Sequence, residues 1–479
     1  MISPGGLFTD FYELTMAQGY MLQNHNPGVV FDMFFRRPPF GSGFTIFAGL
    51  QPVLESIEKF SFTKEDCEYL RSLGVFQETF LEYLLEFRFT GNIWACDEGT
   101  VVFPNEPIIR IEANLCEAQL IESLVLNTIN FQTLIATKTA RICLAARGKQ
   151  ILEFGMRRAQ GKDGAFSATR AAFIGGAEAT SNTYAGKNLD IPVRGTMAHS
   201  WIMSYTSELE AFRKYAELYP DSSVFLMDTY DTLESGLKNA VIVGKELIKK
   251  GITRFGVRLD SGDLEYLSKE VRKAMDDAGL HDAFIVVSNE LSEEIIQQLV
   301  VRKSPIDIWG VGTNLVTAKD DPALTGVYKL AEIDQGGIQQ PVMKISNNPE
   351  KMTNPGRKQV FRFLDAEKKP LADLIALEDE HIQESVKYRF YHPLYEYSHF
   401  DIEGAEVRPL LSCVMKKGIA EKPCVPLHEI QHYVKSQLGM LDQTYTRLLN
   451  PHEYKVSLSE QLKTLKVNLI LNAAKKGAV

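Results

Sequence analysis

One arrangement repeats six times between residues 151 and 314: an apolar run, a short polar stretch, and then a segment with helical spacing. The runs begin roughly 25–40 residues apart, which is the spacing of strand–helix units in a parallel sheet. The intervening helices are expected at 204–218, 231–249, 264–278 and 292–301. The six strand candidates are residues 151–158, 191–200, 223–232, 253–263, 283–292 and 306–314.

Six such units fit either a barrel or an open, doubly wound sheet. No GxGxxG sequence follows the first apolar run, and polar residues gather at the carboxyl end of every run. The loops at that end of a barrel build its site, so this pattern favours the barrel. We therefore predict the α/β fold class, with an α/β barrel over residues 117–316.

The flanking segments lack this regularity. Residues 1–116 read as mixed α+β, with a helix in LFTDFYELTMAQGY that Thr9 would cap and a strand at 29–35. Residues 317–479 begin with short antiparallel strands and end in an amphipathic helix near 457–474. These two segments are expected to lie outside the barrel.

Composition excludes several classes of function. The 479 residues carry 52 Lys and Arg against 61 Asp and Glu, a net charge of −9. This charge argues against a nucleic-acid or membrane-surface binder. The six cysteines form no CxxC pair, so neither a zinc knuckle nor a disulfide framework is expected. No Lys or Arg precedes Arg36 and no apolar run has membrane-spanning length, so we expect a cytoplasmic protein.

The segment TRFGVRLDSGDL, residues 253–264, reads as a strand, a tight turn and a helix start. Residues two apart on a strand share a face, so Arg258 and Asp260 should project to the same side. Ser261 is the expected N-cap, with Asp263 in the first helical turn. One such turn alone would be an ordinary salt-bridged βα connection.

The other strand ends extend this set. They present Glu153, Arg157, Arg158, Thr196, His199, Asp228, Ser288, Asn289, Gly310, Gly312 and Thr313. The GVGTN sequence suits phosphate, because its glycines leave backbone N–H groups unobstructed, and the arginines offer bidentate donors. Asp228, Asp260 and Asp263 could hold Mg²⁺ through water and substrate phosphates.

His199 is the one imidazole in this set. A lone histidine is more often structural, but beside a phosphate-binding rim it could act as a nucleophile or a general acid–base. No GxSxG or Walker A sequence occurs, which sets aside serine hydrolase and P-loop chemistry.

Six motifs in order resemble the nicotinate phosphoribosyltransferase family: TDFYELTMAQGY, FRRPPFGSGFTIFAGL, LEFGMRRAQG, GTMAHSW, GVRLDSGDL and GVGTNLVT. The resemblance extends from the amino terminus to about residue 365. It implies transfer of a phosphoribosyl group from 5-phosphoribosyl 1-pyrophosphate to nicotinate in NAD salvage, giving nicotinate mononucleotide and pyrophosphate. It also implies Mg²⁺, and ATP hydrolysis that assists through a phosphohistidine.

The resemblance assigns roles to individual residues. His199 is the phosphorylated residue, Tyr12 stacks on the pyridine ring, and Thr196 and Arg258 bind nicotinate. The further implied substrate contacts are Phe154 as the opposite aromatic wall, Arg157 on the phosphoribosyl group, Gly312 and Thr313 on its 5-phosphate, and Ser288 and Asn289. Asp260 is expected at the ribose hydroxyls or, with Asp263, at the metal.

The resemblance also implies an irregular α/β barrel with an open-faced sandwich built from both chain ends. Related enzymes form dimers in which the amino-terminal tyrosine enters the neighbour's site. Thr180 or Ser181 falls where nicotinamide enzymes carry an aspartate, which suits a carboxylate substrate, although Glu178 lies close by. The alternatives are nicotinamide or quinolinate phosphoribosyl transfer, a non-catalytic barrel scaffold, or a sugar-phosphate aldolase or isomerase.

Overall fold

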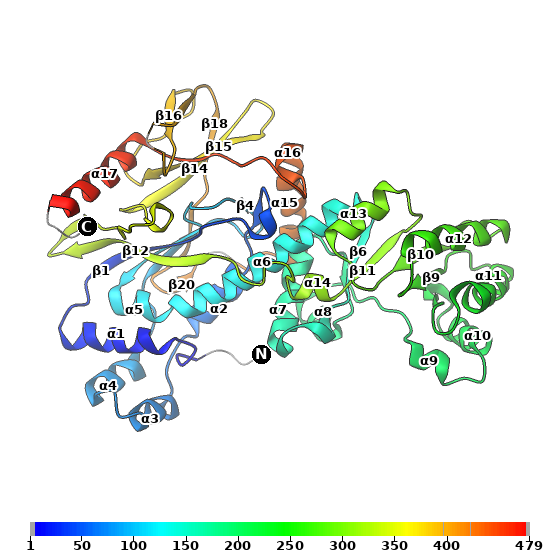
Figure 1. Ribbon diagram of the computed structural model, residues 1–479. Coiled ribbons are helices and arrows are strands. Elements are labelled where there is room, and N and C mark those ends of the chain that lie inside the picture. Colours follow the sequence, from blue (N-terminus) through cyan, green and yellow to red (C-terminus); the bar gives the residue numbers. More distant parts are fainter. Residues whose placement is uncertain (1–4, 396, 422, 476–479) are drawn as a thin grey trace. The chain divides into compact units, whose positions relative to one another are not determined.

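The computed structural model describes residues 5–395, 397–421 and 423–475 of the chain. The chain divides into two compact units. The first combines Met1–Leu134 with Ala323–Val479, and the second is Ile135–Pro322. The first boundary falls inside the long helix α6 (Glu122–Ala146) (Figure 1).

The second unit contains a six-stranded sheet in which all neighbours are parallel. The sheet order is β7-β6-β11-β10-β9-β8, so the first strand along the chain lies beside both the second and the last. All other neighbours in the sheet are consecutive along the chain. Among the described residues, β7 and β8 are the only consecutive strands of this sheet that do not pair. The strands are β6 (Gln150–Glu153), β7 (Ala179–Thr180), β8 (Val224–Leu226), β9 (Gly256–Leu259), β10 (Phe284–Val287) and β11 (Ile308–Val311).

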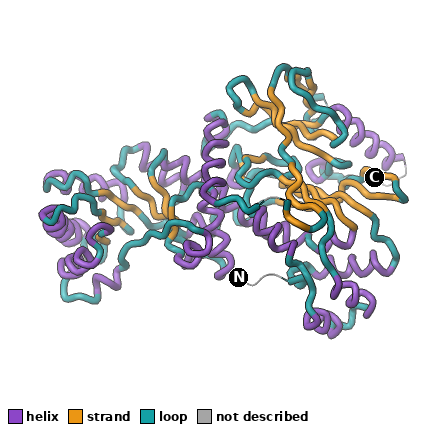
Figure 2. The backbone as a smooth tube through the Cα atoms, turned by 180° about the vertical axis from the view of Figure 1, so that it is seen from behind, coloured by secondary structure: helices purple, strands orange, loops and turns teal. Residues whose placement is uncertain are grey.

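Helices alternate with these strands, so the expected α/β class is confirmed. Figure 1 shows α11 and α12 beside β9 and β10, and Figure 2 shows the strands in orange with helices around them. All four expected helices are present. The helices of this unit include α7 (Gly161–Ile174), α10 (Glu208–Leu218), α11 (Lys238–Lys249), α12 (Leu264–Asp277) and α13 (Glu293–Val301).

Strand β9 explains how polar side chains reach the site. Val257 and Leu259 are completely buried on one face, whereas Arg258 alternates with them and is partly exposed on the other. Leu259 pairs with Val287 of β10, so Asp260 and Ser288 follow their strands at the same level. The parallel register therefore brings these two strand ends together.

Two expectations about this unit were wrong. Residues 191–200 form no strand, and only an isolated bridge joins Val193 to Thr180. Pro192 has no N–H group to donate, and Gly195 has no side chain to pack. The N-cap of α12 is Asp263, which accepts from the backbone N–H groups of Glu265 and Tyr266, both at 3.1 Å, so Ser261 is not the cap.

The first unit joins both ends of the chain in one antiparallel sheet. Strand β1 (Gly28–Phe35) pairs with β5 (Ile109–Asn114) on one side and with β12 (Gly326–Gln335) on the other. Seven of its eight residues are buried, and the strand has a hydrogen-bonded neighbour on each edge. A second, six-stranded sheet is formed by residues beyond 357, as expected for strands in this part of the chain.

The first helix of this unit, α1 (Phe11–Leu22), lies where a helix was expected, but its N-cap is Asp10. The Thr9 hydroxyl instead donates to the Leu120 carbonyl at 2.6 Å. Across the described ranges, we find no helix with both the length and the apolar character that a membrane crossing requires.

Candidate active site

Arg258 is the centre of a hydrogen-bonded cluster in the second unit. Its Nε donates to Ser288 Oγ at 2.7 Å, its Nη1 to Thr196 Oγ1 at 2.8 Å, and its Nη2 to Asp260 Oδ1 at 3.0 Å. Two distant segments and the end of its own strand therefore fix one guanidinium. Its side chain remains 15% exposed, so the group is held rigidly and is still accessible.

Asp260 is fixed in turn by its surroundings. Ser288 Oγ donates to the same Asp260 Oδ1 that Arg258 contacts, and the Asp260 backbone N–H donates to Asp228 Oδ2 at 3.2 Å. Ser261 Oγ also donates to Asp228 Oδ2, at 2.6 Å. The other Asp228 oxygen, Oδ1, is buried and has no hydrogen-bond partner within the described residues.

His199 begins the short helix α9 (His199–Met203) and is half-buried. Its Nδ1 lies 3.0 Å from Thr229 Oγ1, and Thr229 directly follows Asp228. Thr196, on the same segment as His199, contacts Arg258. A continuous chain of contacts and neighbouring residues thus connects the imidazole with the arginine.

Phe154 lies beside this cluster. The Arg258 guanidinium carbon is 5.9 Å from the centre of the Phe154 ring. A side chain at Gly310 would begin 2.7 Å from a Phe154 ring carbon, so the ring occupies space that only glycine leaves open. Similarly, a Cβ atom at Gly155 would lie 2.3 Å from Val316. The turn after β6 is therefore pressed against α14 (Thr313–Val316).

Glu153 holds that turn in place. It is almost fully buried and accepts hydrogen bonds from the Gly155 backbone N–H, from Thr169 Oγ1 at 3.0 Å and from Thr180 Oγ1 at 2.5 Å. The Thr180 hydroxyl is thereby engaged inside the protein. Of the polar residues considered for substrate discrimination, Ser181 is partly exposed and Glu178 is exposed.

Other expected site residues lie at the same strand ends. In the described part of the chain, their side chains form no hydrogen bond with the Arg258 cluster. Arg157 and Arg158 are exposed on the short 3-10 helix Met156–Arg158, which packs against α14. Asn289 is exposed and has a positive φ of 111°. Gly312 is the N-cap of α14, and Thr313 is its first residue.

Metal ligands were expected at Asp260 and Asp263. One Asp263 oxygen is occupied by capping α12. Within the described ranges, no group of three or more His, Cys, Asp and Glu side chains is arranged to hold a metal ion.

Tyr12 belongs to the first unit. It lies on α1 and is 46% exposed. Burial of its hydroxyl raises the pKa of Tyr12, and the neighbouring Glu122 and Glu13 carboxylates raise it further. The phenol is therefore neutral at physiological pH.

Sequence reasoning missed Thr229 and the central position of Glu153. Thr229 stands directly after Asp228 at a predicted strand end, so a signal for it was present. The partners of Glu153 are 16 and 27 residues away, and no local pattern predicts them.

Three family models match the chain. They are the nicotinate phosphoribosyltransferase N-terminal domain over residues 7–130, the nicotinate phosphoribosyltransferase family over residues 149–394, and the corresponding C-terminal domain over residues 357–466. Together they account for most of the sequence.

Individual proteins agree with these matches. Nicotinate phosphoribosyltransferase of Bacillus subtilis (strain 168) is 45% identical over 466 residues, covering 97% of this chain and 95% of the relative. The human enzyme of that name is 32% identical, covering 96% and 95%. The crystal structure of human nicotinic acid phosphoribosyltransferase superposes with a TM-score of 0.86, covering 96% of this chain and 99% of that one. The chain belongs to the nicotinate phosphoribosyltransferase family.

Proposed function

We propose that this enzyme joins nicotinate to 5-phosphoribosyl 1-pyrophosphate, giving nicotinate mononucleotide and pyrophosphate. The pyridine nitrogen forms the new bond to the anomeric carbon, and the bond from that carbon to the pyrophosphate oxygen breaks. The main tasks of the protein are alignment of the two substrates and stabilisation of charge on the leaving group. Family membership supports the reaction, and the Arg258 cluster is the observation that carries it to particular residues.

Arg258 and Thr196 are the proposed nicotinate contacts. A guanidinium has five N–H groups, and three of those of Arg258 are bound by Ser288, Thr196 and Asp260. The two that remain, one on each terminal nitrogen, suit the two oxygens of a carboxylate. Phe154 supplies an aromatic face beside them. Thr180 is buried, and its hydroxyl donates to Glu153 and accepts from the Asn182 backbone N–H, so it presents no carboxylate that would attract an amide N–H.

The phosphoribosyl donor takes the exposed side of the strand ends. We assign Arg157 to its pyrophosphate or ribose phosphate, and Gly312 and Thr313 to the 5-phosphate. The absence of a side chain at Gly312 leaves its N–H open, and the Thr313 hydroxyl adds a donor. Ser288 and Asn289 complete this set of substrate contacts.

The carboxylates at these strand ends are the proposed magnesium ligands. Asp228 Oδ1 is a buried oxygen without a partner among the described residues, and Asp260 lies next to Asp228. Mg²⁺ commonly takes one or two carboxylates and completes its shell with water and substrate phosphates. Asp260 and Asp228 would hold it, with Asp263 reaching it through water. Bound there, the ion neutralises phosphate charge.

ATP is the proposed second substrate. The γ-phosphoryl group passes to His199 Nε2 as its bond to the ADP oxygen breaks, and water later releases it as phosphate. Thr229 at Nδ1 supports this choice of nitrogen, since an imidazole whose Nδ1–H is bonded presents the Nε2 lone pair. This coupling would place the enzyme in the ligase class.

The larger assembly is also proposed. The order of the six parallel strands supports an irregular α/β barrel in which β7 and β8 close the ring without regular pairing. The sheet shared by both chain ends supports the open-faced sandwich.

We further propose a homodimer in which Tyr12 enters the partner's site. The cytoplasm is the proposed location, and six cysteines without a CxxC pair suit its reducing conditions.

Pyrophosphate release tests the reaction. The purified chain with nicotinate, 5-phosphoribosyl 1-pyrophosphate and Mg²⁺ should release one pyrophosphate for each nicotinate mononucleotide formed. Omitting nicotinate should stop the release. Release that does not depend on a pyridine substrate, or no release at all, would refute the proposal.

A further inference from the structure

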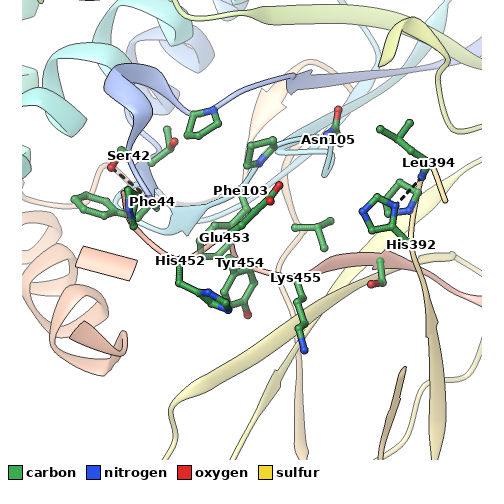
Figure 3. A pocket seen from close by; sticks show the side chains of 18 of the residues that line it. Ser42, Phe44, Phe103, Asn105, His392, Leu394, His452, Glu453, Tyr454 and Lys455 are labelled. Carbon is green, nitrogen blue, oxygen red and sulfur yellow. Dashed lines mark hydrogen bonds between the residues drawn. The ribbon is translucent and has the colours of Figure 1, made fainter. Parts of the chain in front are cut away.

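A separate cavity of about 550 Å³ lies within the first unit, away from every residue assigned above. Its walls come from distant parts of the chain: the turn at 41–45, residues 103–105, residues 392–394, 398 and 400, and the strand entry at 450–457. Figure 3 shows Ser42 and Phe44 toward one end, His392 and Leu394 toward the other, and Phe103 and Tyr454 between them. The volume lies within the range of small-molecule sites.

Thr45 gives the first sign of a ligand. It lines the cavity and is completely buried, yet its hydroxyl has no hydrogen-bond partner in the described part of the chain. A buried hydroxyl without a partner is costly and uncommon in native proteins. A polar group that enters the cavity and shifts the wall enough to reach this oxygen would satisfy it.

His392 and Asn105 provide further polar groups. The Nδ1 atom of His392 accepts from the backbone N–H groups of Leu394 at 3.1 Å and Tyr395 at 3.0 Å. Burial lowers the pKa of His392, so the ring is neutral and its proton is on Nε2, which can donate. The Asn105 amide forms no side-chain hydrogen bond with the described residues and can both donate and accept.

Charge in the cavity is sparse. Glu453 and Lys455 are the charged residues of its lining, and both are exposed. The Lys455 ammonium lies 4.5 Å from the centre of the Phe400 ring, so it stands at the edge of an aromatic wall. The single Lys455 ammonium suits a ligand in which one anionic group is attached to a ring that packs on the aromatic side chains.

The remaining wall is flat and stiff. Phe103 and Tyr454 stack with ring centres 3.7 Å apart, and the Tyr454 hydroxyl donates to Asp373 at 3.0 Å. Arg362 binds the same Asp373 through both oxygens, at 2.9 and 2.6 Å. A buried ionic network thus fixes the aromatic pair from behind, so this part of the wall is held in place.

We propose that this cavity binds a nucleoside monophosphate. The base lies among the aromatic rings and prolines, the ribose and base edge meet Thr45, Asn105 and His392, and the phosphate meets Lys455. The proposal does not depend on the transfer reaction, because no residue of the candidate active site lines the cavity.

Calorimetric titration of the full chain with adenosine monophosphate tests the proposal. Adenosine and inorganic phosphate are titrated separately. Saturable binding is expected for the nucleotide, with much weaker binding of its two parts. The variants are Lys455→Met and Thr45→Val, and Lys416→Met, an exposed lysine on another strand of the same unit, is the matched control.

Each cavity variant should raise the Kd for adenosine monophosphate at least tenfold, whereas Lys416→Met should leave it unchanged. Transfer activity and melting temperature of Lys455→Met should match the parent, which shows that the fold is intact. The proposal is overturned if adenosine monophosphate does not bind at millimolar concentration, if phosphate alone binds equally well, or if both cavity variants bind it like the parent.

Discussion

At the scale of single residues, His199 has one ring nitrogen in contact with Thr229. The contact between Nδ1 and Thr229 Oγ1 orients the ring, and His199 remains half-buried at the start of a five-residue helix. If Nδ1–H donates to Thr229, the Nε2 lone pair is the one left for chemistry. The proposed coupling to ATP depends on that selection, while the nicotinate contacts do not.

His199→Ala should therefore separate coupling from transfer. We expect the ratio of rates with and without ATP to fall to unity, while some ATP-independent transfer remains because the Arg258 cluster is intact. Initial rates of nicotinate mononucleotide formation measure both quantities. Thr229→Val, which leaves the imidazole in place, should give an intermediate ratio. Undiminished ATP stimulation of the alanine variant would rule out the phosphohistidine.

Glu13, next to Tyr12, links stability to pH. It is completely buried, and burial raises its pKa from 4.5 to about 7, although the hydrogen bond from Ser123 opposes the shift. The folded state therefore holds this proton more tightly than the unfolded state. The free energy of unfolding should fall as pH rises from 4.5 to about 7, by at most about 3 kcal/mol from this group.

Glu13→Gln should flatten this part of the stability profile, as measured by urea unfolding at a series of pH values. Glu82→Gln, at an exposed position on the helix Glu78–Glu86, is the control and should keep the parent's slope. If the Glu13 variant also retains the slope, the titrating group is elsewhere.

At the scale of elements, long apolar runs were predictable from sequence and short or irregular segments were not. Strands β8 to β11 and their helices lie where hydrophobic spacing placed them. The two-residue strand β7 is too short to have a pattern. Residues 191–200 have an apolar start but contain Pro192 and Gly195, and the chain there makes a single bridge.

The candidate site follows the same division. The pairing of Arg258 with Asp260 was predictable because it follows from alternation along one strand. Arg258 also donates hydrogen bonds to Thr196 and Ser288, which lie 62 and 30 positions away along the chain. These bonds depend on the order of strands in the sheet. Sequence alone therefore identified the participants at strand ends, and the fold determined which of them touch.

Gly310 connects strand geometry with the aromatic wall. A methyl group there would lie 2.7 and 2.9 Å from two Phe154 ring carbons, so Gly310→Ala must displace the ring. We expect the KM for nicotinate to rise roughly tenfold, in line with the cost of overpacking. Gly164→Ala on α7, where nothing lies within 4 Å, should leave KM unchanged. Equal KM values for the two variants would place the substrate away from Phe154.

At the scale of the whole molecule, the two units of the chain carry different parts of the proposed function. The second unit holds the polar strand ends, and the first unit holds Tyr12 and the sheet shared by both chain ends. An acidic protein with a net charge of −9 has thus gathered arginines at one rim, where two anionic substrates are proposed to bind.

The proposed dimer can be tested by complementation. Tyr12→Ala and Arg258→Ala should each be inactive alone. After co-expression, mixed dimers would contain one intact site if Tyr12 serves the partner's site, so activity should recover to about a quarter of the parent's under random pairing. If Tyr12 serves its own chain, mixing restores nothing.

The central claim is that the Arg258 guanidinium recognises a carboxylate, and the ratio of kcat/KM for nicotinate to that for nicotinamide tests it most directly. We expect a strong preference for nicotinate in the parent. In Arg258→Lys, which lacks the fork, the preference should shrink by about 100-fold, and Arg254→Lys at an exposed position before the same strand should retain it. Comparable kcat/KM values for the two pyridines in the parent, or an unchanged preference in Arg258→Lys, would contradict the account.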